Sequence, residues 1–205
     1  MTSKIFIETI KIKDGVFYDS PFHTARMNKT AKEFFKKDKN FTLTDEIIPA
    51  EYRQGLVKCR ILYSDKILSI DFTPYSFRKI DQLQLVINNE IEYAYKYQNR
   101  EIFDELKKQS TEEILIAKNG YITDTSYTNV VFQDKTGFYT PDTFLLPGTK
   151  REKLLQQGII HERKIHINDL HKYDCIYLIN AMMDLEDEIK IPVSKINLPV
   201  NLLLQ

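Results

Sequence analysis

The sequence carries no excess of charge of either sign. Its 29 Lys and Arg residues balance 29 Asp and Glu residues, so the formal net charge at pH 7 is zero. Because nucleic acids and anionic lipids are held by surplus positive charge, we expect neither as a partner. Any anion that this protein binds must therefore be held by a local site.

Cysteines are few, and long apolar runs are absent. The two cysteines, Cys59 and Cys175, point to neither a disulfide framework nor a metal cluster, and they fit a reducing compartment. The N-terminus has no apolar core of the signal-peptide kind, and the most apolar run, Cys175 to Met183, is too short to span a bilayer. We therefore expect a soluble, cytoplasmic protein with no membrane partner and no metal site.

Apolar and aromatic residues are plentiful. Hydrophobic residues make up 42% of the chain, and its 12 Tyr and 12 Phe favour strands and aromatic packing. This composition supports a core and argues against disorder. A chain of 205 residues forms one large domain or two smaller ones.

The first part of the chain combines alternating apolar runs with two helical patterns. Ser20 and the proline after it have the form of a helix cap, and they predict a helix that continues to about Phe35. A second helix is expected from about Tyr97, with Ile102, Phe103 and Leu106 on one face. Strands are expected at residues 5–12, twice within 51–76, and at 83–86. This part reads as α+β.

The second part is richer in hairpins. Asn119-Gly120, between two apolar runs, is a type I′ turn signal. A helix is expected from Lys150 until Gly158 stops it. Strands are expected at residues 114–117, 121–123, 130–132, 138–140 and 176–179. The change in pattern places a domain boundary at about residue 109, which gives an N-terminal α+β domain, 1–109, and a β-rich α+β domain, 110–205.

Two segments of the second part can carry chemistry. At the expected helix start, Pro147-Gly148-Thr149 offers outward backbone N–H groups, a glycine that allows close approach and a hydroxyl donor, which together can cradle a phosphate. An ordinary helix cap is the alternative. Asp124 follows an expected strand, and its carboxylate can either close an Asx-type turn or face a protonated ring nitrogen.

Two upstream segments add a lysine and an arginine. Lys96 lies among tyrosines that can desolvate its ammonium group and so favour a nucleophilic amine. It can equally be an exposed lysine lying over aromatic rings. His23 and Arg26 fall one helical turn apart, and arginine suits forked recognition of a phosphate. A helix-surface pair without a ligand is the alternative.

In this order, the four segments resemble the class IV aminotransferases, the fold-type IV enzymes that depend on pyridoxal 5′-phosphate (PLP). The resemblance spans roughly residues 8–184 and is most specific from Asp124 to Arg151. There the family shows an acid, four residues, an asparagine, an apolar strand, Thr-Pro, and Leu-Pro-Gly followed by Thr-Lys or Thr-Arg. The matching residues are Asp124, Asn129, Val130 to Phe132, Thr140-Pro141 and Leu146 to Lys150.

The resemblance implies a two-domain α+β fold like that of D-amino-acid aminotransferase, with a shortened N-terminal domain and PLP bound between the domains. It implies that Lys96 is the catalytic lysine that forms a Schiff base with PLP and that Arg26 holds the phosphate. Asp124 would pair with the ring nitrogen, although the family usually has the longer glutamate there. The other cofactor-binding residues implied are Asn129, Gly148, Thr149, Asn180 and Ala181.

The implied activity is that of a PLP-dependent class IV aminotransferase, a homodimer that acts on an amino acid or a related amine. The alternative is aminodeoxychorismate lyase, which eliminates pyruvate to give 4-aminobenzoate, and Asn180-Ala181-Met182 leans toward that branch. A non-catalytic PLP-binding protein and a small α+β protein without cofactor are two further alternatives. The short N-terminal domain leaves the substrate open.

Overall fold

The computed structural model describes residues 4–36, 38 and 40–199. Its contacts divide the chain into two compact units. Unit 1 comprises residues 1–77 and 95–99, and unit 2 comprises residues 78–94 and 100–205. Within the described residues, no helix is both long enough and apolar enough to cross a membrane.

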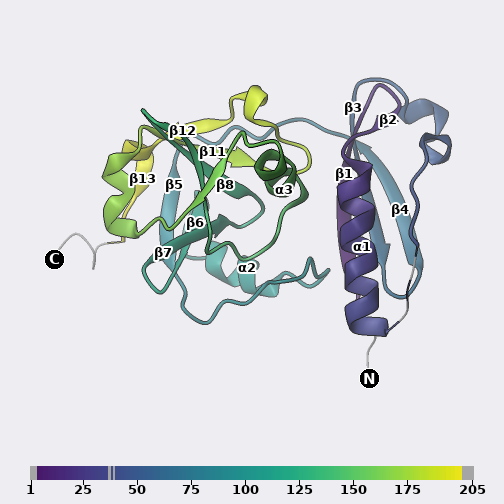
Figure 1. The fold of residues 1–205 in the computed structure, drawn as a ribbon, viewed down its shortest axis with the longest axis horizontal. Coiled ribbons are helices and arrows are strands. Elements are labelled where there is room, and N and C mark those ends of the chain that lie inside the picture. Colours follow the sequence, from purple (N-terminus) through teal and green to yellow (C-terminus); the bar gives the residue numbers. More distant parts are fainter. Residues whose placement is uncertain (1–3, 37, 39, 200–205) are drawn as a thin grey trace. The chain divides into compact units, whose positions relative to one another are not determined.

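Unit 1 is an antiparallel sheet with one long helix along one face (Figure 1). The strand order is β2-β1-β3-β4. Phe6, Ile10 and Ile12 share a buried cluster with Met27 of the helix, so alternate residues of the first strand face that helix. The elements are β1 (Phe6–Lys13), β2 (Val16–Phe17), α1 (Ser20–Phe35), β3 (Leu56–Tyr63) and β4 (Ile67–Pro74).

The residues Tyr95–Asn99 complete this sheet. Ile7 N donates to Lys96 O at 2.9 Å, and Gln98 N donates to Ile5 O at 3.0 Å. The segment therefore runs antiparallel to β1, along the edge that β3 does not occupy. This extended pairing holds residues that the sequence pattern assigned to a helix.

The starts of two helices differ from the prediction. α2 spans Glu101–Lys107 rather than beginning near Tyr97. Phe103 and Leu106 are buried as expected, but Ile102 is 38% exposed. α1 has the expected length, but its N-cap is Asp19, with no side-chain cap, and Ser20 is its first residue. Proline in the first turn still fits the fixed φ that a helix start requires.

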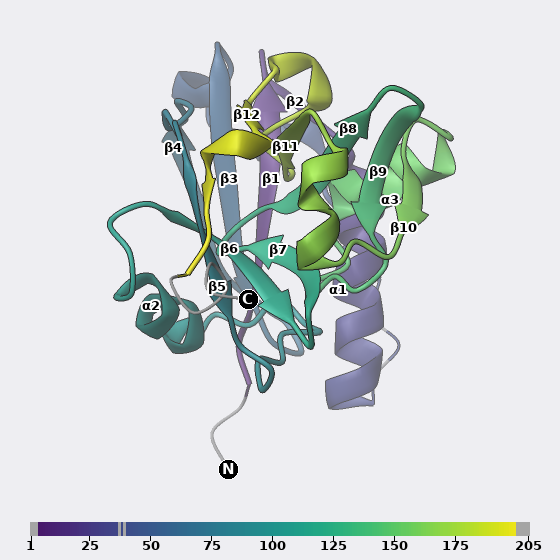
Figure 2. The same ribbon diagram turned by 90° about the vertical axis from the view of Figure 1, so that its left-hand side faces the viewer.

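Unit 2 holds two sheets, with strand orders β10-β9-β8-β11-β12 and β13-β5-β6-β7 (Figure 2). Leu154 of α3 packs in a cluster with Val131 and Ile179 of the first sheet. Asn119 and Gly120 have φ of 52° and 81°, which confirms the type I′ hairpin. The strands and the helix are β5 (Leu83–Ile87), β6 (Glu113–Lys118), β7 (Tyr121–Thr125), β8 (Asn129–Asp134), β9 (Gly137–Pro141), α3 (Thr149–Gln156), β10 (His161–Arg163), β11 (Cys175–Ile179), β12 (Lys190–Pro192) and β13 (Ile196–Asn197).

The α+β class is as predicted, but the division of the chain differs from a boundary at residue 109. β5 pairs in parallel with β6, which binds residues 83–87 into a sheet of unit 2. The change of pattern near residue 109 marks the start of a run of hairpins. Long-range strand pairing, which the local pattern does not contain, sets the division.

Candidate functional site

Asp124 lies on β7 with only 5% of its surface exposed. Its Oδ2 accepts hydrogen bonds from Leu145 N at 2.9 Å and Leu146 N at 3.0 Å, and its Oδ1 accepts one from Asn129 Nδ2 at 2.8 Å. Burial raises the pKa of Asp124 to about 6, although these three bonds oppose the shift. Among the described residues no cation is ion-paired with this carboxylate, and the charge of Arg151 is the smallest influence on it.

Asn129 connects Asp124 to the turn before α3. Besides its bond to the acid, Asn129 Nδ2 donates to Leu146 O at 2.9 Å. A Cβ added to Gly148 would lie 1.8 Å from Asn129 Oδ1, so no side chain fits at that position. The sequence suggested a glycine that lets a ligand approach, and the structure adds that Gly148 makes room for the asparagine amide.

The N-terminus of α3 follows this turn directly. No side chain caps the helix, and its first turn closes when Glu152 N donates to Gly148 O at 2.9 Å. Thr149 and Lys150 are 3% and 2% exposed. The buried Lys150 ammonium forms an ion pair with the partly exposed carboxylate of Asp184, which ties the first turn of the helix to the segment that follows β11.

Asn180 and Ala181 lie in that segment, just after β11. Asn180 Oδ1 accepts from Met182 N at 2.8 Å, and its Nδ2 donates to Tyr127 O at 3.4 Å. The second contact reaches the turn that follows Asp124. The sequence reasoning did not predict Asp184, whose role depends on Lys150, a residue 34 positions away in the chain.

The turn after Asp124 is also fixed from the other side. The Arg100 guanidinium donates to Ser126 O and lies 4.9 Å from the ring centre of Phe103. Ser126 N donates to Glu113 Oε1 at 3.0 Å. Hydrogen bonds and one ion pair therefore connect three short segments of unit 2. These segments contain six of the predicted site residues, which are Asp124, Asn129, Gly148, Thr149, Asn180 and Ala181.

Unit 1 contains a second buried polar cluster. Glu8 is 0% exposed and accepts from Arg26 Nε and Nη2, both at 2.7 Å, while His23 Nδ1 lies 2.8 Å from Glu8 Oε2. Burial would raise the pKa of Glu8, but Arg26 and His23 outweigh it and hold that pKa well below its usual range. Burial lowers the pKa of His23, with the Glu8 hydrogen bond opposing. The cluster is thus a carboxylate, a guanidinium and a neutral imidazole.

This cluster changes the interpretation of His23 and Arg26. His23 is 1% exposed, so the pair does not lie on a helix surface. The sequence reasoning missed Glu8, the partner of both residues. The available signal was an acidic residue between Phe6 and Ile10, on the face of β1 that is otherwise apolar.

Lys96 is half-buried on the segment that pairs with β1. The rings of Tyr95 and Tyr97 lie 6.5 Å and 5.2 Å from that of Phe6, on the side of the sheet that carries α1. Because successive side chains of an extended segment point to opposite faces, Lys96 lies on the other face. Its neighbouring tyrosines pack into the core of unit 1, which differs from the expected tyrosine pocket around the amine.

Comparison with known proteins gives three findings. The family model for amino-transferase class IV matches residues 97–187. An uncharacterized protein of Haemophilus influenzae is 38% identical over 180 residues, which are 85% of this chain and 96% of that protein. A solved structure of a candidate 4-amino-4-deoxychorismate lyase from Haemophilus somnus 129PT is 34% identical, with a TM-score of 0.80 over 90% of this chain and 99% of that one.

A more distant solved structure has the same fold. A hypothetical aminotransferase from Mycobacterium tuberculosis, in its PLP-bound form, is 14% identical, with a TM-score of 0.71 over 88% of this chain and 78% of that one. The predicted fold, that of the fold-type IV PLP enzymes in a shortened form, is thereby confirmed.

Proposed function

Because the chain belongs to the class IV aminotransferase family, whose enzymes depend on PLP, we propose that it binds PLP through Lys96 and converts an amino acid or a related amine. The observation that carries the proposal is the buried Asp124 carboxylate, which three N–H donors hold in place without a paired cation. A protonated ring nitrogen is a cation that meets this need. When bound, PLP supplies an electron sink for negative charge on the substrate carbon.

The shorter acid fits this role because the chain compensates for the missing methylene. Backbone N–H groups of Leu145 and Leu146 hold the Asp124 carboxylate directly against the loop before α3. Asn129 fixes the other carboxylate oxygen, and the Asn129 amide is itself confined by Gly148. We propose that these contacts aim the carboxylate at the ring nitrogen, with Asn129 as a positioning residue.

The phosphate would be held by Gly148, Thr149 and Arg26. Gly148 and Thr149 present the N-terminus of α3, where backbone N–H groups and the helix dipole favour an anion. Arg26 uses Nε and Nη2 for Glu8, and the five N–H donors of a guanidinium allow it to bind a phosphate as well. Asn180 and Ala181 would border the cofactor in the adjoining turn.

Lys96 would carry the proton-transfer step. Its backbone is fixed to β1 by the bond from Ile7 N, so the side chain starts from a rigid strand. We propose that Lys96 Nζ takes the proton from the substrate carbon and returns it in the second half of the reaction. Transamination is the primary assignment, in a homodimer such as the family implies.

A second activity, the elimination of pyruvate from aminodeoxychorismate, is favoured by one observation. The 34% identical structure, whose chain is matched over 99% of its length, is a candidate lyase for that substrate. Supplying an amino donor with a 2-oxo acid, and separately aminodeoxychorismate, decides between them. Pyruvate and 4-aminobenzoate from the second assay, with no turnover in the first, would rule out transamination.

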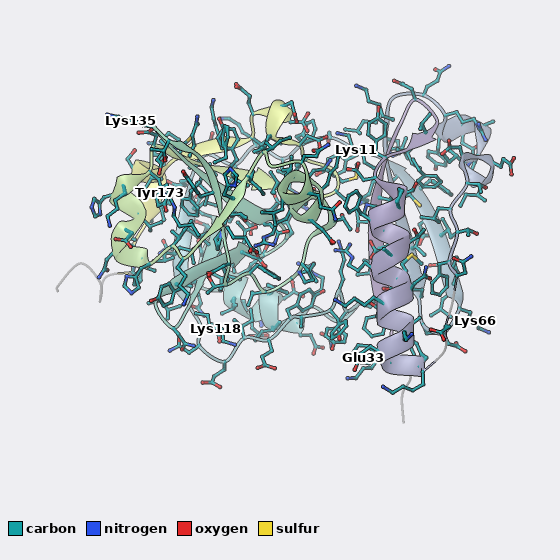
Figure 3. All side chains as sticks on the ribbon, in the orientation of Figure 1. Lys11, Glu33, Lys66, Lys118, Lys135 and Tyr173 are labelled. Atoms are coloured by element: carbon teal, nitrogen blue, oxygen red, sulfur yellow. The ribbon has the colours of Figure 1, made fainter. Side chains whose placement is uncertain are left out.

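The cofactor assignment is tested by absorbance and by borohydride. The protein mixed with PLP should absorb in the near-visible range, and borohydride should fix the cofactor to Lys96, as located by peptide mass spectrometry. Lys135, exposed in the turn between β8 and β9 (Figure 3), provides the control. Lys135→Ala should retain the fixed cofactor and Lys96→Ala should lose it. A reducible adduct in Lys96→Ala would disprove the assignment of Lys96, and a protein that stays colourless with PLP would disprove the proposal that it binds this cofactor.

A further inference from the structure

Arg151, the third residue of α3, is a buried cation with no part in the proposed reaction so far. Only 4% of its surface is exposed. Its Nη2 donates to Pro141 O at 2.9 Å and to Glu162 Oε1 at 2.6 Å. Its Nε is buried and has no hydrogen-bond partner among the described residues, which costs free energy. Hydrogen bonding alone therefore does not explain why this guanidinium is buried.

The Arg151 guanidinium also lies over an aromatic ring. Its central carbon is 4.0 Å from the ring centre of Phe144. A guanidinium is attracted to the face of such a ring, and more strongly where water is excluded. Phe144 belongs to the loop of residues 142–148, which joins β9 to α3 (Figure 2). Because Pro141 is the last residue of β9, Arg151 contacts this loop both where it starts and at Phe144.

Phe144 directly precedes the two residues that hold the Asp124 carboxylate. The N–H groups of Leu145 and Leu146 donate to Asp124 Oδ2 at 2.9 Å and 3.0 Å. On the other side of Phe144, the Thr143 hydroxyl donates at 2.7 Å to a backbone carbonyl of β7. The position of the Phe144 ring therefore bears directly on the position of the two N–H donors that follow it.

We infer that Arg151 is a positioning residue for Asp124. Through Phe144 and Pro141 O, it fixes the 142–148 loop, so that the loop's two N–H donors stay aimed at the carboxylate. The inference rests on the proposed function for the part that this carboxylate plays toward PLP. A lysine would be a poor substitute, because the extended plane of a guanidinium can contact a ring and two acceptors at once.

Amide hydrogen exchange of the full chain without PLP, followed residue by residue by NMR, tests the inference. In Arg151→Met, the N–H groups of Leu145 and Leu146 should exchange at least tenfold faster than in the wild type, because the loop opens more often. Their acceleration should exceed that of Leu178 N–H, which donates to Ile189 O at 2.9 Å outside the loop. Equal acceleration of all three groups would indicate a general loss of stability and would overturn the inference.

A second variant and a matched control identify the contact. Phe144→Leu keeps the arginine but removes the ring, and it should speed exchange at the same two N–H groups of the loop. Arg163→Met removes a guanidinium that lies 3.2 Å from the ring centre of Tyr139 in the same unit, and it should change exchange at those two groups less than twofold. Unchanged exchange in both Arg151→Met and Phe144→Leu, or an equal change in Arg163→Met, would overturn the inference.

PLP labelled with nitrogen-15 in its ring gives a readout that a merely structural role would not move. In the PLP-loaded wild type at neutral pH, the NMR shift of this nitrogen should be that of its protonated form, because the Asp124 carboxylate favours the cation. In Arg151→Met the shift should move toward that of the unprotonated form, and identical shifts in the two proteins would overturn the inference. Selective acceleration of exchange at the two loop donors supports the inference even where PLP fails to attach to Lys96, so that failure would refute the proposed function alone.

Discussion

Replacing Asp124 by asparagine tests whether the buried carboxylate carries a free-energy cost that a bound cation removes. The pKa of Asp124 is about 6 in the folded protein, against an ordinary value of 3.8. Between these two values the folded state keeps the proton while the unfolded chain releases it. Stability therefore falls as the pH rises through this interval.

The magnitude follows from the two pKa values. Their difference corresponds to about 3 kcal/mol of lost stability once the carboxyl is ionised in both states, and about 2.5 kcal/mol of it falls between pH 4 and pH 8. Asparagine has no charge to bury, but its amide nitrogen faces the Asn129 amide, which costs about 1 kcal/mol. Without PLP, Asp124→Asn should thus be the more stable protein at pH 8, by about 2 kcal/mol.

Urea unfolding of both proteins, without PLP, measures this difference. The chain has no tryptophan, so the fluorescence of its 12 tyrosines and circular dichroism follow unfolding. Glu8, whose pKa is lowered, loses its stabilising effect only as the pH falls below its ordinary value of 4.5, and it does so in both proteins. Excess PLP should stabilise the wild type more than the variant. A stability difference that stays constant within about 1 kcal/mol from pH 4 to pH 8 would refute the reasoning.

Three further substitutions test individual contacts. Glu8→Gln removes the charge that orients the guanidinium beside it, and PLP affinity, titrated by absorbance, should fall at least tenfold. Gly148→Ala places a Cβ 1.8 Å from Asn129 Oδ1 and should cost about 2 kcal/mol in urea unfolding, but little once Asn129→Ala has made room. Lys150→Met leaves the partly exposed Asp184 carboxylate without its cation and should cost about 2 kcal/mol, part of which Asp184→Asn restores.

Each of these three predictions has a control variant or a result that would contradict it. Glu33→Gln, on the exposed surface of α1 (Figure 3), should leave PLP affinity unchanged, and a loss equal to that of Glu8→Gln would indicate a general effect of charge. Additive costs in the Gly148 and Asn129 pair would show that the two residues do not compete for space. If the effects of Lys150→Met and Asp184→Asn on the free energy of unfolding are additive, their ion pair contributes nothing to stability.

Local signals predicted those parts of the fold that short segments determine. Asn119-Gly120 required two left-handed residues and has them, and the periodicity after Ser20 gave α1 its length. α2 began four residues later than expected, because Tyr97 and its neighbours pair with β1. A strand pairing between residues some 90 positions apart leaves no trace in the local pattern, so neither that helix start nor the division into units could be predicted.

The candidate site divides in the same way. Asp124, Asn129 and Gly148 lie within 25 residues of one another, and their order in the chain was enough to group them. Glu8 and Asp184 were missed because each is identified by the buried group with which it pairs. The partners, Arg26 and Lys150, are brought to them by tertiary packing alone.

The return of Tyr95–Asn99 to the first sheet has a consequence for how the chain assembles during synthesis. The ribosome delivers β1 through β4 first, and the edge of β1 at Ile5 and Ile7 waits for a strand that emerges later. Lys96 arrives on that strand, so the hydrogen bonds that finish the sheet also fix the position of the lysine. A gene divided after Phe77 would yield two fragments, and the lysine would regain its place only when the second fragment adds its strand to the first.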